Sequence, residues 1–112
     1  MTKRDHEKSS GNVFADIGVS APDQALAKAE LARQIARVIA ARRLTQAEAA
    51  SVLGLDQPKV SALLRGRLGG FSTERLFRLL NALGRDVQIV IRPARPRASA
   101  RVSVRAARSG VG

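Results

Sequence analysis

The sequence has no cysteine and a single histidine, and these two shortages exclude whole classes of site. Without cysteine the chain can form no disulfide framework, iron–sulfur site or thiolate zinc site. His6 lies in a polar leader, so a histidine-based triad or a multi-histidine metal site is excluded as well. No nucleophile–base pair or metal-binding set can be assembled from what remains. We therefore predict a protein that is not an enzyme and uses no cofactor.

Aromatic residues and long apolar runs are also scarce. The chain has three aromatic residues, Phe14, Phe71 and Phe77, which argues against a single-strand binder that stacks bases on aromatic platforms. No stretch approaches the roughly 20 apolar residues that cross a membrane. The first residues lack the apolar centre of a signal peptide. A cytoplasmic protein without membrane contact is expected.

Acidic residues are outnumbered, with 9 Asp and Glu against 20 Lys and Arg and a net charge of +11. Such a surplus favours a polyanionic partner, and nucleic acid is the leading candidate. Residues 93–112 contain five arginines and no acid, which predicts a disordered basic tail. Residues 1–19 are predicted to be a flexible leader with an apolar patch at Val13, Phe14 and Ile17. That patch either folds back onto its own domain or docks a partner.

Residues 20–92 are predicted to form one domain with four to five helices. Each predicted helix follows a residue that can cap its N-terminus, and three of them end at a glycine. The four capping residues are Ser20, Thr45, Asp56 and Ser72, and the glycines are Gly54, Gly66 and Gly84. The first helix reaches about residue 43, the second spans 46–53, the third begins at 57, and the fourth spans 73–83. Apolar side chains at helical spacing give each helix an inward face.

Segment 86–92 has a different pattern, because apolar β-branched residues alternate along it. Val87, Ile89 and Ile91 share one face of the predicted strand. A lone strand cannot satisfy its backbone, and no second run of this quality is present. The expected fold is therefore mainly α, with one C-terminal β-strand that pairs with a second copy of the chain.

The stretch LTQAEAASVLGLDQPKVSALLRGR, residues 44–67, has the spacing of two short helices that cross at a tight turn. The turn needs a residue that tolerates positive φ, which Gly54 supplies. The crossing needs a small side chain, which Ala50 supplies. Inward positions are apolar, as expected if the motif joins a scaffold: Ala49, Leu53, Leu55, Val60 and Leu63.

Polar residues outside that packed set are the candidate contacts with DNA. N-terminal residues of the second motif helix would face base edges in the major groove, where Gln57 could bridge adenine N6 and N7. The predicted base-contacting residues are Gln57, Pro58, Lys59 and Ser61. The predicted phosphate-contacting residues are Thr45, Gln46, Arg65, Arg67 and Ser72. The alternative is a plain four-helix bundle whose glutamines are ordinary surface residues.

Stretch 44–67 resembles the Xre/Cro family of lambda-repressor-like helix-turn-helix proteins. The wider stretch 11–93 is similar to HigA-type antitoxins, on GNVFADIGV, AELARQIARVIAARRLTQAEAA and FSTERLFRLLNALGRDVQIVIRP. The resemblance implies a homodimer that represses its own operon and neutralises a partner toxin, typically an mRNA-cleaving endonuclease. It also implies DNA contacts from Gln46, Gln57, Lys59 and Ser61. The arginine-rich tail is not part of the shared pattern.

Three functions remain open on the sequence. The first is an antitoxin-repressor that binds a near-palindromic DNA operator as a homodimer and a cognate toxin through Val13, Phe14 and Ile17. The second is a stand-alone Xre-family regulator without a toxin. The third is a nucleoid-coating or RNA-binding protein that works through its basic tail alone. The apolar leader favours the first over the second, and the defined recognition helix favours both over the third.

Overall fold

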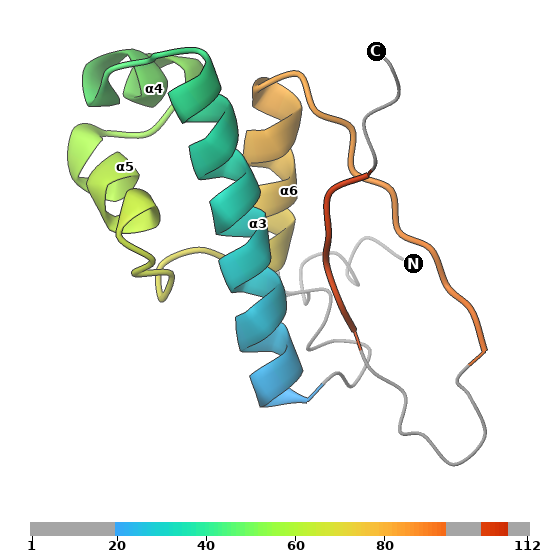
Figure 1. The fold of residues 1–112 in the computed structure, drawn as a ribbon. Helices are drawn as coiled ribbons and strands as arrows, with labels where there is room; N and C mark the ends of the chain where they lie inside the picture. Colours follow the sequence, from blue (N-terminus) through green and yellow to red (C-terminus); the bar gives the residue numbers. More distant parts are fainter. Residues whose placement is uncertain (1–19, 94–101, 108–112) are drawn as a thin grey trace, which may run out of the picture.

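The computed structural model describes residues 20–93 and 102–107, and its regular structure is helical. Figure 1 shows the four helices in that part of the chain: α3 (Ala21–Ala41), α4 (Gln46–Leu53), α5 (Gln57–Leu64) and α6 (Thr73–Ala82). All four predicted capping residues occupy N-cap positions. The predicted helices are therefore confirmed, with ends within about two residues of those expected.

The first helix, α3, is long enough to contact both the motif and α6. Its N-terminus is fixed by Ser20, whose side chain accepts the N–H of Asp23 at 3.3 Å. Its C-terminal turn closes at Arg43, which has a φ of 56°. That left-handed conformation lets Leu44 donate its N–H to the carbonyl of Ile39 and turns the chain toward α4.

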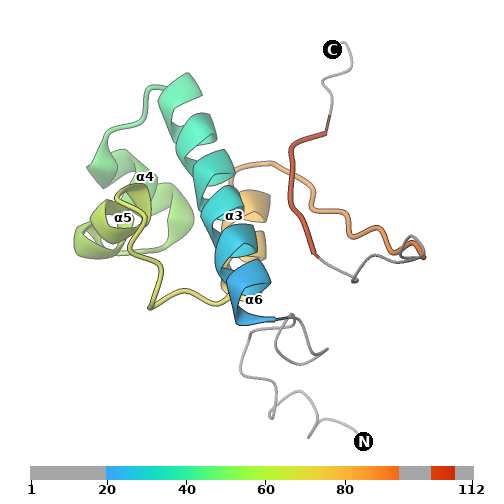
Figure 2. The same cartoon turned by 60° about the horizontal axis from the view of Figure 1, so that its bottom comes forward.

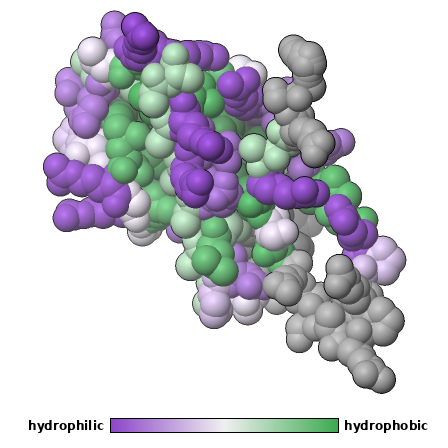
Figure 3. Space-filling view, viewed as in Figure 1, coloured by the Kyte–Doolittle hydropathy of each residue, from purple (hydrophilic) through white to green (hydrophobic). Residues whose placement is uncertain are grey.

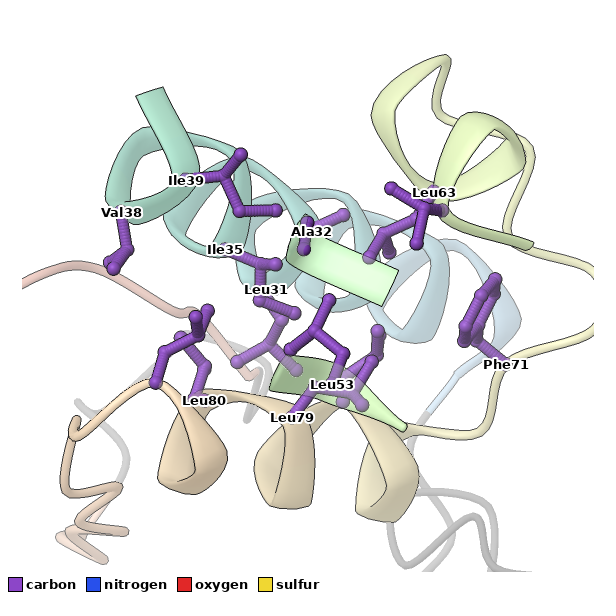
Figure 4. Packing of buried hydrophobic residues seen from close by; sticks show 14 of the residues in the cluster. Leu31, Ala32, Ile35, Val38, Ile39, Leu53, Leu63, Phe71, Leu79 and Leu80 are labelled. Atoms are coloured by element: carbon purple, nitrogen blue, oxygen red, sulfur yellow. The ribbon is translucent and has the colours of Figure 1, made fainter. Parts of the chain in front are cut away.

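The core lies between α3, α6 and the two motif helices. Figure 4 shows side chains of α3 and α6 meeting along their lengths, with Leu53 of α4 and Leu63 of α5 reaching in from the motif. The predicted apolar stripe of α3 is buried as a whole: Ala27, Leu31, Ile35, Val38 and Ile39. Phe71, in the loop before α6, closes the core at one end and is 3% exposed. The motif is therefore held against a rigid two-helix scaffold.

The turn between α4 and α5 has the geometry that its sequence predicts. Gly54 adopts a φ of 69° and ends α4, and its N–H donates to the carbonyl of Ala50. Leu55 donates to the same carbonyl at 3.0 Å. Ala50 is buried, as expected where two helices approach closely. Leu55 is half-buried and packs against the core, so the turn is anchored from its inner side.

The C-terminal ends of α3 and α6 are tied together by one side chain. Arg42, at the C-cap of α3, donates from its guanidinium to the carbonyl of Leu83 after α6. Gly84, with a φ of 81°, follows that carbonyl and turns the chain out of the helix. A charged donor to the last carbonyls of a helix also complements the negative end of its dipole.

Beyond α6, the chain runs along the bundle without forming a strand in the residues described. Segments 86–93 and 102–107 both lie on the side away from α4 and α5 (Figures 1 and 2). Val87 and Val104 pack against the core, whereas Ile89 and Ile91 are 61% and 91% exposed. The segment predicted to be a strand forms none among the described residues. Val104, which lies in the tail predicted to be disordered, contacts the core. Among the described residues, none of the helices combines the length and the hydrophobicity of a membrane span.

Candidate nucleic-acid interface

The N-terminus of α4 combines a fixed cap with free backbone donors. Thr45 accepts the N–H of Glu48 at 3.0 Å, and Glu48 accepts the N–H of Thr45 at 2.8 Å, which makes a complete capping box. The hydroxyl hydrogen of Thr45 stays available, because a hydroxyl can donate while it accepts. Gln46 and Ala47 are exposed, and their amides precede the first intrahelical bond. This end of α4 can therefore donate several hydrogen bonds to an anion.

The N-terminus of α5 projects from the bundle while its opposite side is locked into the core. Val60 is 0% exposed and Leu63 is 2% exposed, so the helix cannot rotate about its axis. Asp56 caps it by accepting the N–H of Lys59 at 3.0 Å. Gln57 and Pro58 are both exposed on the outer side. Pro58 removes no hydrogen bond in this first turn. The outer face of α5 is thus rigid and accessible.

Ser61 and Lys59 are less exposed than the two residues at the start of α5. Ser61 lies one turn after Gln57 and is half-buried, so it sits on the same face but deeper. The side chain of Lys59 takes another direction: its Nζ lies 5.9 Å from the centre of the Phe71 ring. The four predicted base-contacting residues are therefore not equivalent, since three follow the outer face and Lys59 turns toward the α5–α6 loop.

The predicted phosphate-contacting residues lie around this face. Arg65 and Arg67 follow α5 and are exposed, with Gly66 between them at a φ of 77°. Ser72 caps α6 by accepting the N–H of Arg75 at 3.0 Å, and its hydroxyl hydrogen is likewise available. Figure 3 shows hydrophilic side chains projecting along the edge that α4 and α5 form. These side chains are of the kinds that donate hydrogen bonds to phosphate oxygens.

The charge of this region is more balanced than that of the whole chain. Residues 44–75 hold four basic residues and three acidic ones, whereas the chain as a whole carries +11. The largest part of the surplus lies in the five arginines of 93–112, and two more positive charges come from Arg42 and Arg43 after α3. The motif itself therefore supplies geometry more than charge, and non-specific attraction to a polyanion must come largely from the rest of the chain.

Two residues beside this face, Phe71 and Arg75, were not among the contact residues predicted from the sequence. Arg75, in the first turn of α6, has its Cζ 5.5 Å from the centre of the same Phe71 ring that Lys59 contacts. A side chain-to-loop contact of this kind has no periodic signal in the sequence. The candidate dimer residues lie elsewhere, in the segment after α6. Val13, Phe14 and Ile17 fall outside the described residues.

Comparison with known proteins agrees with this geometry. The family model of a helix-turn-helix domain matches residues 13–92, which is most of the chain. The chain belongs to this helix-turn-helix family. The chain is also similar to a solved structure assigned to the XRE family of transcriptional regulators, with 53% identity and a TM-score of 0.75. That similarity covers 79% of this chain and 100% of the other. Among curated proteins, none matches significantly. The predicted Xre-type helix-turn-helix fold is confirmed.

Proposed function

We propose that this protein is an XRE-type transcriptional repressor that recognises a specific duplex DNA sequence. The observation that supports this most is the pair of exposed helix N-termini on one rigid motif. Gln46 begins α4 and Gln57 begins α5, and both stand outside the core that fixes those helices. In the helix-turn-helix docking mode, the second helix enters the major groove while the first crosses the backbone. The protein acts by binding rather than by catalysis.

Each helix then has a separate task in recognition. On α5, Gln57 reads a base edge, Pro58 offers apolar contact to a thymine methyl, and Ser61 reaches the next base. On α4, the side chain of Gln46 and the amides beside it bind a phosphate, which sets the position of the protein on the duplex. Arg65 and Arg67 neutralise further phosphates after α5. In this division α5 determines which DNA sequence is bound, and the phosphate contacts of α4, Arg65 and Arg67 add affinity for any sequence.

We also propose that the protein is a homodimer joined through segment 86–92. Ile89 and Ile91 form an apolar surface that is exposed to solvent in a single copy of the chain. Antiparallel pairing of two such segments across a two-fold axis satisfies their backbone groups and covers these side chains. The same axis would place two recognition helices about 34 Å apart, one turn of duplex, so the operator is expected to be a near-palindrome.

A role as the antitoxin of a toxin–antitoxin operon rests on the resemblance of 11–93 to HigA-type antitoxins. In this proposal Val13, Phe14 and Ile17 anchor the toxin, since large apolar side chains dominate many interfaces. The alternative is a stand-alone XRE-type regulator. Co-expression with the product of the adjacent reading frame separates the two. Relief of that product's toxicity supports the antitoxin, and relief that persists without residues 1–20 removes the leader as the toxin site.

DNA recognition is tested by selection from a random duplex pool. The protein is incubated with 30-base-pair duplexes carrying a random centre, and bound duplexes are amplified and sequenced through several rounds. Enrichment of a two-fold symmetric sequence is expected. A Gln57→Ala, Ser61→Ala variant selected in parallel should lose or change that sequence. An unenriched pool for the unmodified protein would contradict the proposal.

A further inference from the structure

Lys59 and Arg75 converge on one buried aromatic ring at the edge of the interface. Lys59 Nζ lies 5.9 Å and Arg75 Cζ lies 5.5 Å from the centre of the Phe71 ring. The ring is 3% exposed, so it is part of the core and cannot move aside. Its face attracts both cations through its quadrupole. The two charges are therefore held in place by a rigid element that belongs to neither helix.

Neither of these two cations has a carboxylate partner within the described ranges. The ion pair of that part of the chain joins Arg33 to Glu30 on α3, far along the sequence from this ring. Two like charges drawn to one ring repel each other, and an anion that contacts both would relieve this repulsion. The surroundings also permit close approach, because the backbone at Gly70 lies beside Lys59 Nζ without a side chain between them.

The position of Lys59 on α5 directs it toward the wall of a DNA groove rather than its floor. The major groove is about 12 Å wide, and a helix with its side chains is about 10–12 Å across, so α5 would fill the groove. Side chains on the outer face, led by Gln57, then meet bases, while those on a flank meet the phosphates that line the groove. Lys59 lies on the flank next to the α5–α6 loop, with its amine over Phe71.

We propose that Lys59 and Arg75 together bind one backbone phosphate of DNA, with Phe71 holding both cations in place. This inference rests on the proposed DNA binding, and it moves Lys59 from the base-contacting group to the phosphate-contacting group. Sequence choice by α5 then depends on Gln57, Pro58 and Ser61. The ligand of this pair is a phosphodiester group of the DNA backbone.

The test compares Lys59→Ala, Arg75→Ala and the double variant on two duplexes. One is the duplex enriched by the unmodified protein, and the other has the same bases in scrambled order. Arg78→Ala is the matched control, because Arg78 is exposed on the same helix and carries the same charge. Dissociation constants are measured at several salt concentrations, and helical content is checked by circular dichroism for each variant.

Each single substitution should weaken binding to both duplexes by the same factor and leave their affinity ratio unchanged. The double variant should lose less than the product of the two single losses, because both cations serve one phosphate. Its slope of log affinity against log salt should fall by about 0.9. Arg78→Ala should change the slope less than Arg75→Ala does.

Two results would overturn the inference. If Lys59→Ala weakens the enriched duplex alone, by about 5- to 150-fold, then Lys59 reads a base. If the single losses multiply in the double variant, the two residues contact separate phosphates. Failure of the proposed function has a different signature, because the unmodified protein would then bind enriched and scrambled duplexes equally.

Discussion

Replacing Ile89 by lysine tests the proposed dimer and has a magnitude that follows from exposure. Complete burial of an isoleucine side chain stabilises by about 1.5–3 kcal/mol. Ile89 is 61% exposed in the single chain, so pairing can bury at most that fraction, about 0.9–1.8 kcal/mol in each protomer. Because the dimer contains two copies of Ile89, the substitution removes about 2–4 kcal/mol of its stabilisation. This loss corresponds to a rise of about 30- to 700-fold in the dissociation constant of the dimer.

Val90→Lys is the matched control for this substitution. Val90 is 63% exposed, close to Ile89, but successive side chains of an extended segment point to opposite sides. Sedimentation equilibrium over a wide concentration range gives the dissociation constant of each variant. Ile89→Lys should dissociate the dimer, and Val90→Lys should leave it intact. Equal effects of the two substitutions, or a wild-type protein that is monomeric throughout, would refute dimerisation through this face.

Three further predictions concern the turns, the loop arginines and the tail. Gly54→Ala should lower the free energy of unfolding by about 1 kcal/mol in denaturant titration, because the new Cβ meets no atom within 4 Å and only the φ of 69° is strained. Arg43→Gly should raise the free energy of unfolding, because Arg43 adopts a φ of 56° that glycine tolerates better. A lower free energy of unfolding for Arg43→Gly would contradict this account of the turns. Replacing Arg65 or Arg67 by alanine should weaken enriched and scrambled duplexes alike and lower the salt slope by about 0.9; an unchanged slope would place that arginine outside the interface. Glutamine in place of the five arginines of 93–112 should reduce affinity for random duplex at low salt while leaving the preference for the enriched duplex, and loss of that preference would show that the tail takes part in recognition.

The helices could be predicted from the sequence because their signals are local. Thr45 and Glu48 stand three residues apart and cap the same helix, and Gly54 supplies the one conformation that ends it. The inward faces of α3 and α6 follow from apolar spacing along each helix. For the same reason, the exposed position of Gln57 could be expected before the fold was known.

Contacts between distant segments could not be predicted in this way. Phe71 receives cations from two different helices, and nothing in the spacing of Lys59 or Arg75 indicates a shared ring. Val104 packs against the core from a segment whose composition is typical of disorder. The alternation in 86–92 predicted a strand, but the segment forms no strand among the described residues. Pairing with a second copy of the chain, as proposed above, is a contact that the sequence of one chain does not specify.

Base readout by Gln57 is the central claim, and a complete single-substitution scan of the enriched duplex tests it most directly. Binding of the unmodified protein and of Gln57→Ala is measured for every base-pair change in the site. The account predicts that Gln57→Ala loses about 1–3 kcal/mol on the enriched duplex and becomes indifferent to one or two base pairs in each half-site, while its preferences elsewhere stay the same. An equal loss on all duplexes, with every preference retained, would contradict base recognition by Gln57.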